Sequence, residues 1–517
     1  MFSNFGGLVQ AVGAAWLMTL IAASDTQVAL VQATTTLPVM VFALFSGAVA
    51  DSYNRRTVML AAQAFMFVVG CILVLVTWMD WINAWSLLAL TFLIGCGVAF
   101  NNPAWQASVR DFVGMDLLPR AVLLNGVGFT VTRSVAPAMG RIIVATFGAV
   151  AAFAINALSY LGVLWAIWSW AGPPPQASRQ RESLGSAIRA GVRYVQMSPH
   201  LRRLYVRGAV FGTGAIAMMA LMPLIARDLL AGDSLTFGLL LGAFGAGAVV
   251  SGLSSERMAQ KYSSEQMIRL SFLALMAAIS VASISPWVWL SMLATALSGW
   301  AWVLALALLN TTVQLSTPRW VVGRAMAFYQ MFTFGGMAFG SWVWGVAVDS
   351  YSLPAAMQLS TVALAVGLLM GLVWPMPSRR DLDLDPLGRW QEPEVQLDIV
   401  PRSGPVSVAI EYQIEEGDVG EFQALMRERR RVRRRDGARQ WTLLRNLENP
   451  QQWIERFELP TWADYVRFHT RPTQEDGKLF DRIRSLHSGP EKPRVRRMLV
   501  RDPGEMRLPV EGSIDLA

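Results

Sequence analysis

Residues 57–78 read TVMLAAQAFMFVVGCILVLVTW, an apolar run without a charged side chain that is long enough to cross a bilayer as one helix. Lipid offers no hydrogen-bond partner to a backbone amide, so a spanning segment must form its bonds within its own helix. Arg55 and Arg56 precede the run, and Asp80 follows it. Because basic residues collect on the cytoplasmic side of a membrane, this helix is expected to start inside.

Eleven further apolar runs of comparable length lie around this one, so the sequence predicts an all-α polytopic membrane protein with twelve transmembrane helices. The expected spans are 4–22, 28–50, 57–78, 84–103, 121–146, 148–170, 205–226, 235–254, 267–285, 287–310, 323–347 and 353–374.

Charge is distributed very unevenly along the 517 residues. Of the 80 charged side chains, 30 lie in residues 1–375 and 50 in residues 376–517. Soluble proteins average about 25% charged residues, so the first part is too poor in charge to face water. This excludes a single soluble enzyme. The net charge of +8 comes from 19 basic and 11 acidic residues in the first part, because the second part has 25 of each.

Basic residues in the short loops predict the orientation of the chain. With the N-terminus inside, the outer loops contain Arg227 alone among basic residues. Both termini are therefore expected in the cytoplasm of a cell, with the chain in the cytoplasmic (inner) membrane. The basic residues of the cytoplasmic loops are Arg55, Arg56, Arg110, Arg120, Arg179, Arg181, Arg189, Arg193, Arg202, Arg203, Arg257, Lys261, Arg269, Arg319 and Arg324.

A basic central loop divides the predicted helices into two groups of six. It covers residues 171–204 and separates a bundle at 1–170 from a bundle at 205–375. A weak repeat relates the halves: Gly47, Asp51 and Arg56 have the same spacing as Gly252, Glu256 and Lys261. Arg120-Ala121 and Arg324-Ala325 likewise open the fifth helix of each half.

The polar remainder is expected to form a separate cytosolic domain. A proline-rich linker, 376–402, precedes a compact domain at 403–500 and a flexible tail at 501–517. Alternating and helical patterns predict a strand, a helix, two strands, a helix and a strand, which is the order of an α+β ferredoxin-like sandwich. The expected elements are strand 406–414, helix 419–432, strands 439–447 and 452–459, a helix containing Leu479, Phe480, Ile483 and Leu486, and strand 495–500.

The loop before the opening run reads GAVADSYNRR at residues 47–56. It resembles the signature of the major facilitator superfamily, in which a glycine, an aspartate and paired basic residues have this spacing. Gly47 would allow close helix approach, and Asp51 could pair with an arginine or a helix N-terminus. An ordinary positive-inside loop is the alternative. The resemblance implies two parallel six-helix repeats. It also implies a cytoplasmic gating latch formed by Gly47, Asp51, Arg55, Arg56, Gly252, Glu256, Lys261 and Arg324.

Further stretches are similar to one branch of that superfamily, the transmembrane secretion effectors, which include siderophore exporters. They are NNPAWQ at 101–106, LPRAVLLN at 118–125, NTTVQ at 310–314 and GRA at 323–325, together with RRDGARQWTL at 434–443 and PTWADYVR at 460–467 in the tail.

The resemblance to this branch implies a transporter rather than an enzyme. It implies export of a small amphipathic molecule, such as a siderophore or a drug, by alternating access, with no cofactor and with protons as the coupling ion. The sequence departs from the family in two places. Residues 136–141 read APAMGR where a Gly-Pro-x-x-Gly-Gly element is usual, and the first helix starts at the membrane, so the true start of the chain is expected either here or upstream.

An arginine within the predicted fifth span is the strongest candidate for contact with the substrate. Arg133 lies 13 residues beyond Arg120, about 20 Å along a helix and so near mid-depth. A charge there is costly and usually faces the bundle interior or a water-filled cavity. A structural arginine bonded to helix carbonyls is the alternative, and Arg141 is expected to snorkel outward. The candidate substrate-binding residues are Asn125, Arg133, Asn156, Asn310 and Gln314.

The coupling site is not evident, because no carboxylate falls within a predicted span away from its ends. There is no phosphate-binding loop for ATP. Cys71 and Cys96 and the three histidines, His200, His469 and His487, show no metal-ligand spacing, so neither a metal nor a disulfide is expected.

The run RERRRVRRR at 427–435 could bind an anion. A solvated helix end and contact with anionic lipid of the bilayer are both compatible with it, whereas nucleic acid is not expected beneath a membrane. The domain around it also resembles the dimeric barrels of cofactor-free monooxygenases. A membrane-tethered enzyme, or a regulatory module that forms a homodimer, therefore remains an alternative. Trp441, Trp453 and Trp462 are expected in its core.

Overall fold

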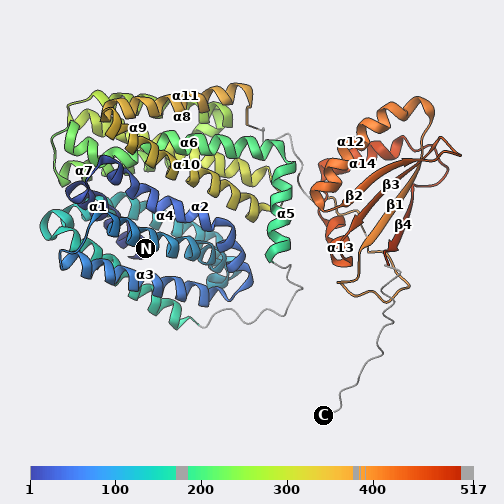
Figure 1. Cartoon of the computed structure of the whole chain (residues 1–517), viewed down its shortest axis with the longest axis horizontal. Coiled ribbons are helices and arrows are strands. Elements are labelled where there is room, and N and C mark those ends of the chain that lie inside the picture. The colour runs from blue at the N-terminus through green and yellow to red at the C-terminus, as the bar shows by residue number, and fades with distance from the viewer. Residues whose placement is uncertain are drawn as a thin grey trace, which may run out of the picture. The chain divides into compact units, whose positions relative to one another are not determined.

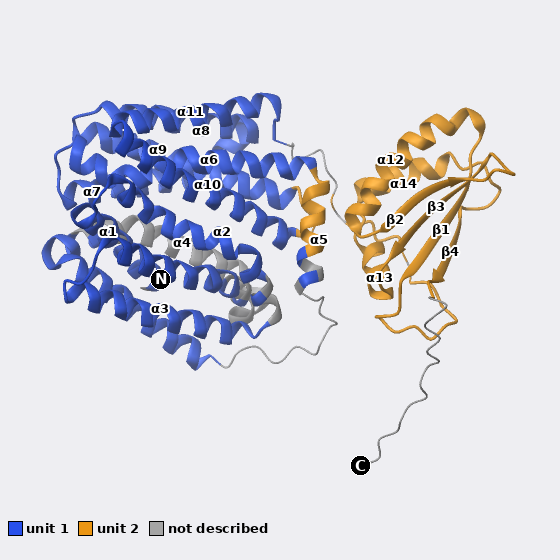
Figure 2. Ribbon diagram, in the orientation of Figure 1, with its two compact units in different colours: residues 1–188, 199–315, 322–378 blue, residues 189–198, 316–321, 379–517 orange. Residues whose placement is uncertain are grey.

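The computed structural model describes residues 2–170, 184–318, 320–376, 384, 386–390 and 392–501. Within these ranges the side chains of residues 2, 48, 50–52, 106–107, 109–138, 141, 184 and 186–187 lie outside the description. The chain forms two compact units (Figure 1, Figure 2). A helical unit contains residues 1–188, 199–315 and 322–378, and a C-terminal unit contains residues 189–198, 316–321 and 379–517.

Long apolar helices make up the helical unit, as the hydropathy pattern predicts. They are α1 (Phe2–Ile21), α2 (Asp25–Ser52), α3 (Arg55–Trp78), α4 (Ala84–Ser169), α6 (Pro199–Leu224), the π-helical turn η1 (Ile225–Leu229), α7 (Ser234–Lys261), α8 (Ser264–Ile284), α9 (Val288–Leu315), α10 (Val322–Ser350) and α11 (Leu353–Val373). Eleven segments of the described chain are long and apolar enough to cross a membrane, including two from α4, Ala84–Trp105 and Ile142–Ser169.

The difference from the twelve expected spans lies within α4. The expected fifth span, 121–146, falls mainly where side chains are not described. At 86 residues, α4 would measure about 130 Å as one straight helix, several times the thickness of a bilayer core. Gly148 has φ +75, a left-handed conformation that interrupts the regular helix between the expected fifth and sixth spans.

Small residues bring helices together, which is how membrane helices pack when lipid removes most of the hydrophobic driving force. A methyl group at Gly212 of α6 would collide with the backbone at Thr333 of α10, and one at Gly336 of α10 would collide with Ala209 of α6. These two helices therefore pack backbone to backbone within the second half of the chain.

The C-terminal unit is built on a four-stranded antiparallel sheet with the order β2-β3-β1-β4. Its elements are β1 (Val406–Gln413), the 3₁₀ turn η2 (Glu416–Asp418), α12 (Val419–Asp436), β2 (Arg439–Arg445), β3 (Gln452–Leu459), α13 (Trp462–Thr470), α14 (Gln474–Ser485) and β4 (Arg494–Leu499). The four strands and the helices α12 and α14 agree with the expected elements to within a few residues. The short helix α13 was not expected.

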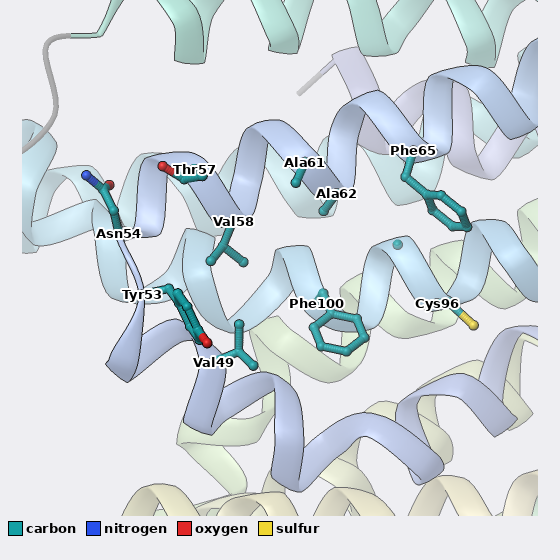
Figure 3. Close-up of a pocket in the computed structure, with 11 residues that line it drawn as sticks. Val49, Tyr53, Asn54, Thr57, Val58, Ala61, Ala62, Phe65, Cys96 and Phe100 are labelled. Atoms are coloured by element: carbon teal, nitrogen blue, oxygen red, sulfur yellow. The ribbon is translucent and has the colours of Figure 1, made fainter. Parts of the chain in front are cut away.

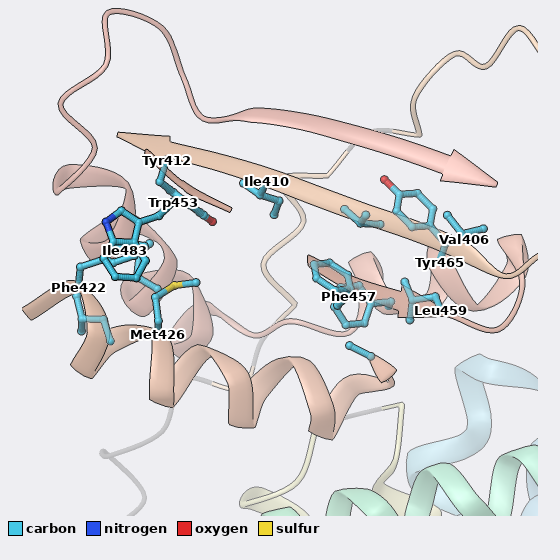
Figure 4. Close-up of a cluster of buried hydrophobic side chains, with 14 of the residues drawn as sticks. Val406, Ile410, Tyr412, Phe422, Met426, Trp453, Phe457, Leu459, Tyr465 and Ile483 are labelled. Atoms are coloured by element: carbon cyan, nitrogen blue, oxygen red, sulfur yellow. The ribbon is translucent and has the colours of Figure 1, made fainter. Parts of the chain in front are cut away.

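Alternate residues of the central strands form the core of this sheet (Figure 4). Val408 and Ile410 of β1 and Phe457 of β3 pack with Phe422 and Met426 of α12. Trp453 and Trp462 are buried in the same core and Trp441 packs against it, so the prediction for these three tryptophans is confirmed. The second half of α5 (Leu184–Met197) and residues 316–321, between α9 and α10, belong to this unit as well.

Candidate functional site

Charged residues join the two halves of the helical unit at the end where α2 begins and α10 ends. Asp349, in the last turn of α10, accepts hydrogen bonds from the backbone N–H of Asp25 at 2.9 Å and of Thr26 at 3.2 Å. The Thr26 hydroxyl donates to the same carboxylate. The first amides of a helix lack partners within the helix and carry partial positive charge. A carboxylate from the second half therefore caps a helix of the first half.

An arginine adds a second connection at this end. Arg227, in η1 of the second half, pairs with Asp25 of the first half at 2.9 Å and donates to the carbonyl of Thr19 at 3.3 Å. It also pairs with its neighbour Asp228. The side chains of Arg227 and Asp25 keep about a third of their exposure, so the pair is a modest contact rather than a permanent one. We call Asp25, Thr26, Arg227 and Asp349 the outer latch, because the basic-loop pattern predicts that this end faces outside.

Close apolar contacts continue from the outer latch between the halves. A methyl group at Gly345 of α10 would lie 2.8 Å from the Cα of Thr26, so only glycine permits this approach. Trp16 of α1 stacks on Phe237 of α7, with ring centroids 6.3 Å apart. Towards the middle of the helices, Met40 of α2 contacts Gly335 of α10. The structure is thus closed at the outer-latch end.

At the opposite end of α2 lies the glycine-aspartate-arginine motif predicted to gate the chain. Asn54 caps α3 by accepting from the N–H of Arg56 at 3.0 Å. The guanidinium of Arg56 donates to the carbonyls of Ile167 at 3.3 Å and Trp168 at 2.7 Å. These are among the last carbonyls of α4, which lack partners within the helix and favour a cation. Arg56 therefore ties the start of α3 to the end of α4.

The other motif residues lie in varied surroundings. A methyl group at Gly47 or at Gly252 would meet no described residue within 4 Å, so the described part of the chain shows no close helix approach at Gly47. Glu256 and Lys261 are exposed in the last turns of α7. The side chain of Asp51 lies outside the described residues, Arg55 opens α3, and Arg324 is half-buried near the start of α10.

A buried charge cluster at this same end was missed in the sequence. Arg207 of α6, only 3% exposed, donates to both carboxylate oxygens of Glu265 at 2.6 and 2.9 Å. Arg269 donates to Glu265 at 2.8 Å, and so does the backbone N–H of Met376 at 3.0 Å. We call Arg207, Glu265 and Arg269 the inner cluster. It holds α6, α8 and the chain after α11 together within the second half.

Gly371 of α11 leaves room for the inner cluster. A side chain there would collide with the guanidinium of Arg207, and the carbonyl of Gly371 accepts a bond from Arg269 at 2.9 Å. The sequence feature that could have revealed the inner cluster is Arg207, a charged residue just inside the expected apolar span 205–226.

The sequence feature that could have revealed the outer latch is Arg227, the one basic residue in the expected outer loops.

The five expected substrate-binding residues have different environments. Asn156 is fully buried, and its amide nitrogen donates to Gln10 and, at 2.9 Å, to the Tyr160 hydroxyl. It therefore joins α1 to α4, and the expectation that it lines a cavity does not hold in this conformation. Gln314 donates to Asn310 at 2.5 Å, so these two form one polar pair on α9. Asn125 and Arg133 lie on α4, with side chains outside the described residues.

The comparisons with known proteins agree with this architecture. The model of the transmembrane secretion effector family matches residues 1–503, nearly the whole chain. The chain belongs to this family. It is a major facilitator superfamily transporter of the enterobactin-exporter-like branch, and a multi-pass membrane protein.

Named relatives fit the same description. Enterobactin exporter EntS of Escherichia coli O1:K1 / APEC is 26% identical over 334 residues, which cover 63% of this chain and 77% of that protein. EntS of Citrobacter koseri is 26% identical over 339 residues, covering 64% and 79%.

Solved structures share the fold. A mutant of the nucleoside transporter NupG has a TM-score of 0.60 at 11% identity and covers 72% of this chain and 96% of that one. A bacterial homologue of the lysosomal transporter Spinster, inward-facing and occupied, has a TM-score of 0.58 at 12% identity and covers 72% and 94%.

Beside the gating motif, this transporter has an apolar pocket of about 620 Å³ between α2, α3 and α4 (Figure 3). Val49 and Tyr53 of the motif line it together with Val58, Phe65 and Phe100. Walls of this kind suit an acyl chain or another apolar group rather than a charged substrate. Among the residues that the structure describes, no group of three or more histidine, cysteine, aspartate or glutamate side chains could hold a metal.

Proposed function

We propose that the chain is a secondary active exporter that moves a small amphipathic molecule, siderophore-like or drug-like, from the cytoplasm to the outside. The observation that carries this proposal is the outer latch, which joins the two halves by exposed polar contacts that can break and re-form. The enterobactin exporters among its relatives support the substrate class. The chain would lie in the inner membrane of the cell, and the basic loops would place both of its termini in the cytoplasm.

The energetics of the latch suit alternating access. Exposed ion pairs contribute about 0 to 1 kcal/mol each, and a carboxylate at a helix N-terminus about 0.3 to 1 kcal/mol. A closed state held by Asp349 and Arg227 would therefore be favoured by only a few kcal/mol. A substrate that binds the outward-open state more tightly could shift that balance.

The transport pathway needs polar groups, because an amphipathic substrate carries polar groups of its own. We propose that residues 121–146 form the remaining span, making two bundles of six, and that Arg133 and Asn125 on it face the pathway opposite Asn310 and Gln314. An arginine there would attract an anionic group of the substrate. Protons would drive export, and the gating residues at the inner ends of the halves would close the cytoplasmic side when the outer latch opens.

The C-terminal domain would serve the transporter rather than catalyse a reaction. Its strand and helix order and its sheet order suit the ferredoxin-like class. We propose that it is a regulatory module through which two transporters form a homodimer.

Efflux from cells tests the proposal. Cells that make a catecholate siderophore and lack their own exporter should secrete it when they express this chain. Arg133→Ala should reduce secretion at least tenfold at equal membrane abundance, because a favourable charge contact within the membrane is lost. Arg141→Ala, a matched loss of an arginine nearer the outer end, should secrete normally. Secretion that is unchanged by Arg133→Ala would overturn the substrate role of Arg133, and no secretion by the unmodified chain would overturn the siderophore class.

A further inference from the structure

An arginine-lined pocket of about 440 Å³ lies wholly within the C-terminal unit. Arg193, from the second half of α5, forms one side of it. Arg430 and Arg434 of α12 form another, and Arg439 and Trp441 of β2 complete the wall. The volume is within the range of small-molecule sites, about 300 to 1,000 Å³.

The basic run of α12 has two faces with different roles. Residues four apart lie on one face of a helix, so Arg429 and Arg433 share one direction and Arg430 and Arg434 the next. Arg429 and Arg433 are buried and bond to Glu455 at 2.9 and 3.2 Å. Arg430 and Arg434 are exposed and line the pocket. The run therefore cannot be described simply as a solvated helix end.

The buried face leaves positive charge beside the pocket. Glu455 is fully buried and takes both arginines, together with the indole N–H of Trp441 at 3.0 Å and the Tyr412 hydroxyl at 3.1 Å. One carboxylate faces two guanidinium groups, so the cluster has a net charge of +1. Trp441 connects the two faces, because its indole N–H bonds to this cluster while the residue lines the pocket.

The exposed face has no internal counter-charge. Within the described part of the chain, Arg430, Arg434 and Arg439 form no ion pair, and no acidic residue lines the pocket. Arg430 lies over the Trp441 ring at 5.7 Å. Arg193 donates from Nε to the carbonyl of Arg435 at 3.2 Å, which fixes its side chain at the edge of the pocket.

We propose that this pocket binds a ligand with two or more negative charges on phosphate groups. Guanidinium groups bond to phosphate through paired N–H donors, which makes arginine the preferred residue for this chemistry. Converging arginines without acids repel one another, and a multiply charged phosphate removes that repulsion. The ligand is either a soluble phosphorylated molecule or the headgroup of an anionic phospholipid.

Occupancy of the pocket would link α5 to α12 and β2. Because α5 leads directly into α6, the first helix of the second half, the phosphate would hold the C-terminal domain to the segment that joins the two halves. This inference rests on the pocket and does not depend on the identity of the transported molecule.

Arginine labelling of the full chain in nanodiscs tests the proposal. Phenylglyoxal modifies accessible arginines, and mass spectrometry reports each site. Inorganic pyrophosphate, added to the chain in phosphatidylcholine nanodiscs, should protect Arg430, Arg434 and Arg439 if the ligand is soluble. Nanodiscs that contain cardiolipin, an anionic phospholipid with two phosphate groups, should protect the same three without pyrophosphate if the ligand is a lipid headgroup. Either outcome supports the pocket and identifies the source of the phosphate.

Matched variants on the same helix separate the pocket from general basicity. Arg434→Gln and Arg439→Gln should each weaken the protecting interaction about tenfold, the loss of one charge-assisted contact. Arg427→Gln and Arg431→Gln remove exposed arginines outside the pocket, and each should weaken the protecting interaction less than threefold. Absence of protection in both kinds of nanodisc would overturn the proposal. Equal protection of Arg427 and Arg431, or equal weakening by the control variants, would overturn it as well.

Discussion

Asp349→Asn should open the outer end of this transporter. The asparagine keeps the shape of the side chain but removes its charge and one acceptor for the two amides of α2, at 2.9 and 3.2 Å. Loss of the interaction with the helix N-terminus costs about 0.3 to 1 kcal/mol, and loss of a charge-assisted hydrogen bond adds a similar amount at an exposed site. The closed state should lose about 1 to 2 kcal/mol, which shifts the closed-to-open ratio about five- to thirtyfold.

Spin-label distances across the outer end measure this ratio. Leu20 of α1, in the first half, is 68% exposed, and Tyr351, just after α10 in the second half, is 76% exposed, so cysteines at both sites would accept labels without disturbing a core. The native Cys71 and Cys96 would first be replaced. Double electron–electron resonance should then show a longer distance population that grows in Asp349→Asn.

Asp80→Asn is the matched control for this change. Asp80 lies between α3 and α4 within the first half and makes no side-chain hydrogen bond to the described residues. Its φ of +58 suits asparagine, so the backbone should not change. Equal distance distributions for Asp349→Asn and Asp80→Asn would refute the reasoning that the Asp349 carboxylate holds the outer end closed.

Three further outcomes follow from buried charges. Glu265→Gln should leave its buried arginine partner without a counter-charge and destabilise the second half by about 3 kcal/mol, seen as a lower midpoint in thermal unfolding of the detergent-solubilised chain. Glu455→Gln should destabilise the C-terminal domain by about 3 to 5 kcal/mol, because two buried arginines then lack a carboxylate. Faster amide exchange in β1 and β3 would report this. Glu458→Gln, on the opposite face of the same strand and paired with the exposed Arg456, should cost less than about 1 kcal/mol. Burial lowers the pKa of His469 to about 4, so the folded domain keeps this ring neutral while the unfolded chain protonates it below about pH 6.5. Stability should therefore be full above pH 6.5 and fall by about 3 kcal/mol as the pH drops towards 4, a loss that His469→Gln removes in urea unfolding at several pH values.

Two arginines keep Glu455 charged in the core of the C-terminal domain. Burial pushes the pKa of Glu455 upward, but Arg429 and Arg433 outweigh it and hold the pKa below its ordinary value. The alternating pattern of β3 places residue 455 inward, but its charge gives no hint of burial. Its pairing with arginines on α12 depends on how the helix packs against the sheet, and local sequence periodicity does not predict that packing.

Membrane spans and the strands of the tail could be predicted because both depend on local hydropathy and periodicity. Contacts between distant helices could not. Gly47 suggested close packing, yet no described residue lies within 4 Å of where a methyl group there would be. Asn156 suggested a cavity, yet its amide nitrogen donates to Gln10 and Tyr160. Arg227 was visible as the exception among outer-loop charges, but its partner Asp25 is 202 residues away in the chain.

Transport by the purified chain tests most directly whether it exports an amphipathic substrate by a proton-driven cycle. Proteoliposomes with the chain oriented inside-out and an acidic interior should accumulate a labelled catecholate siderophore, and a protonophore should release the accumulated label. Protein that is folded by thermal unfolding and spin-label criteria but moves no siderophore under an imposed proton gradient would contradict the proposed function.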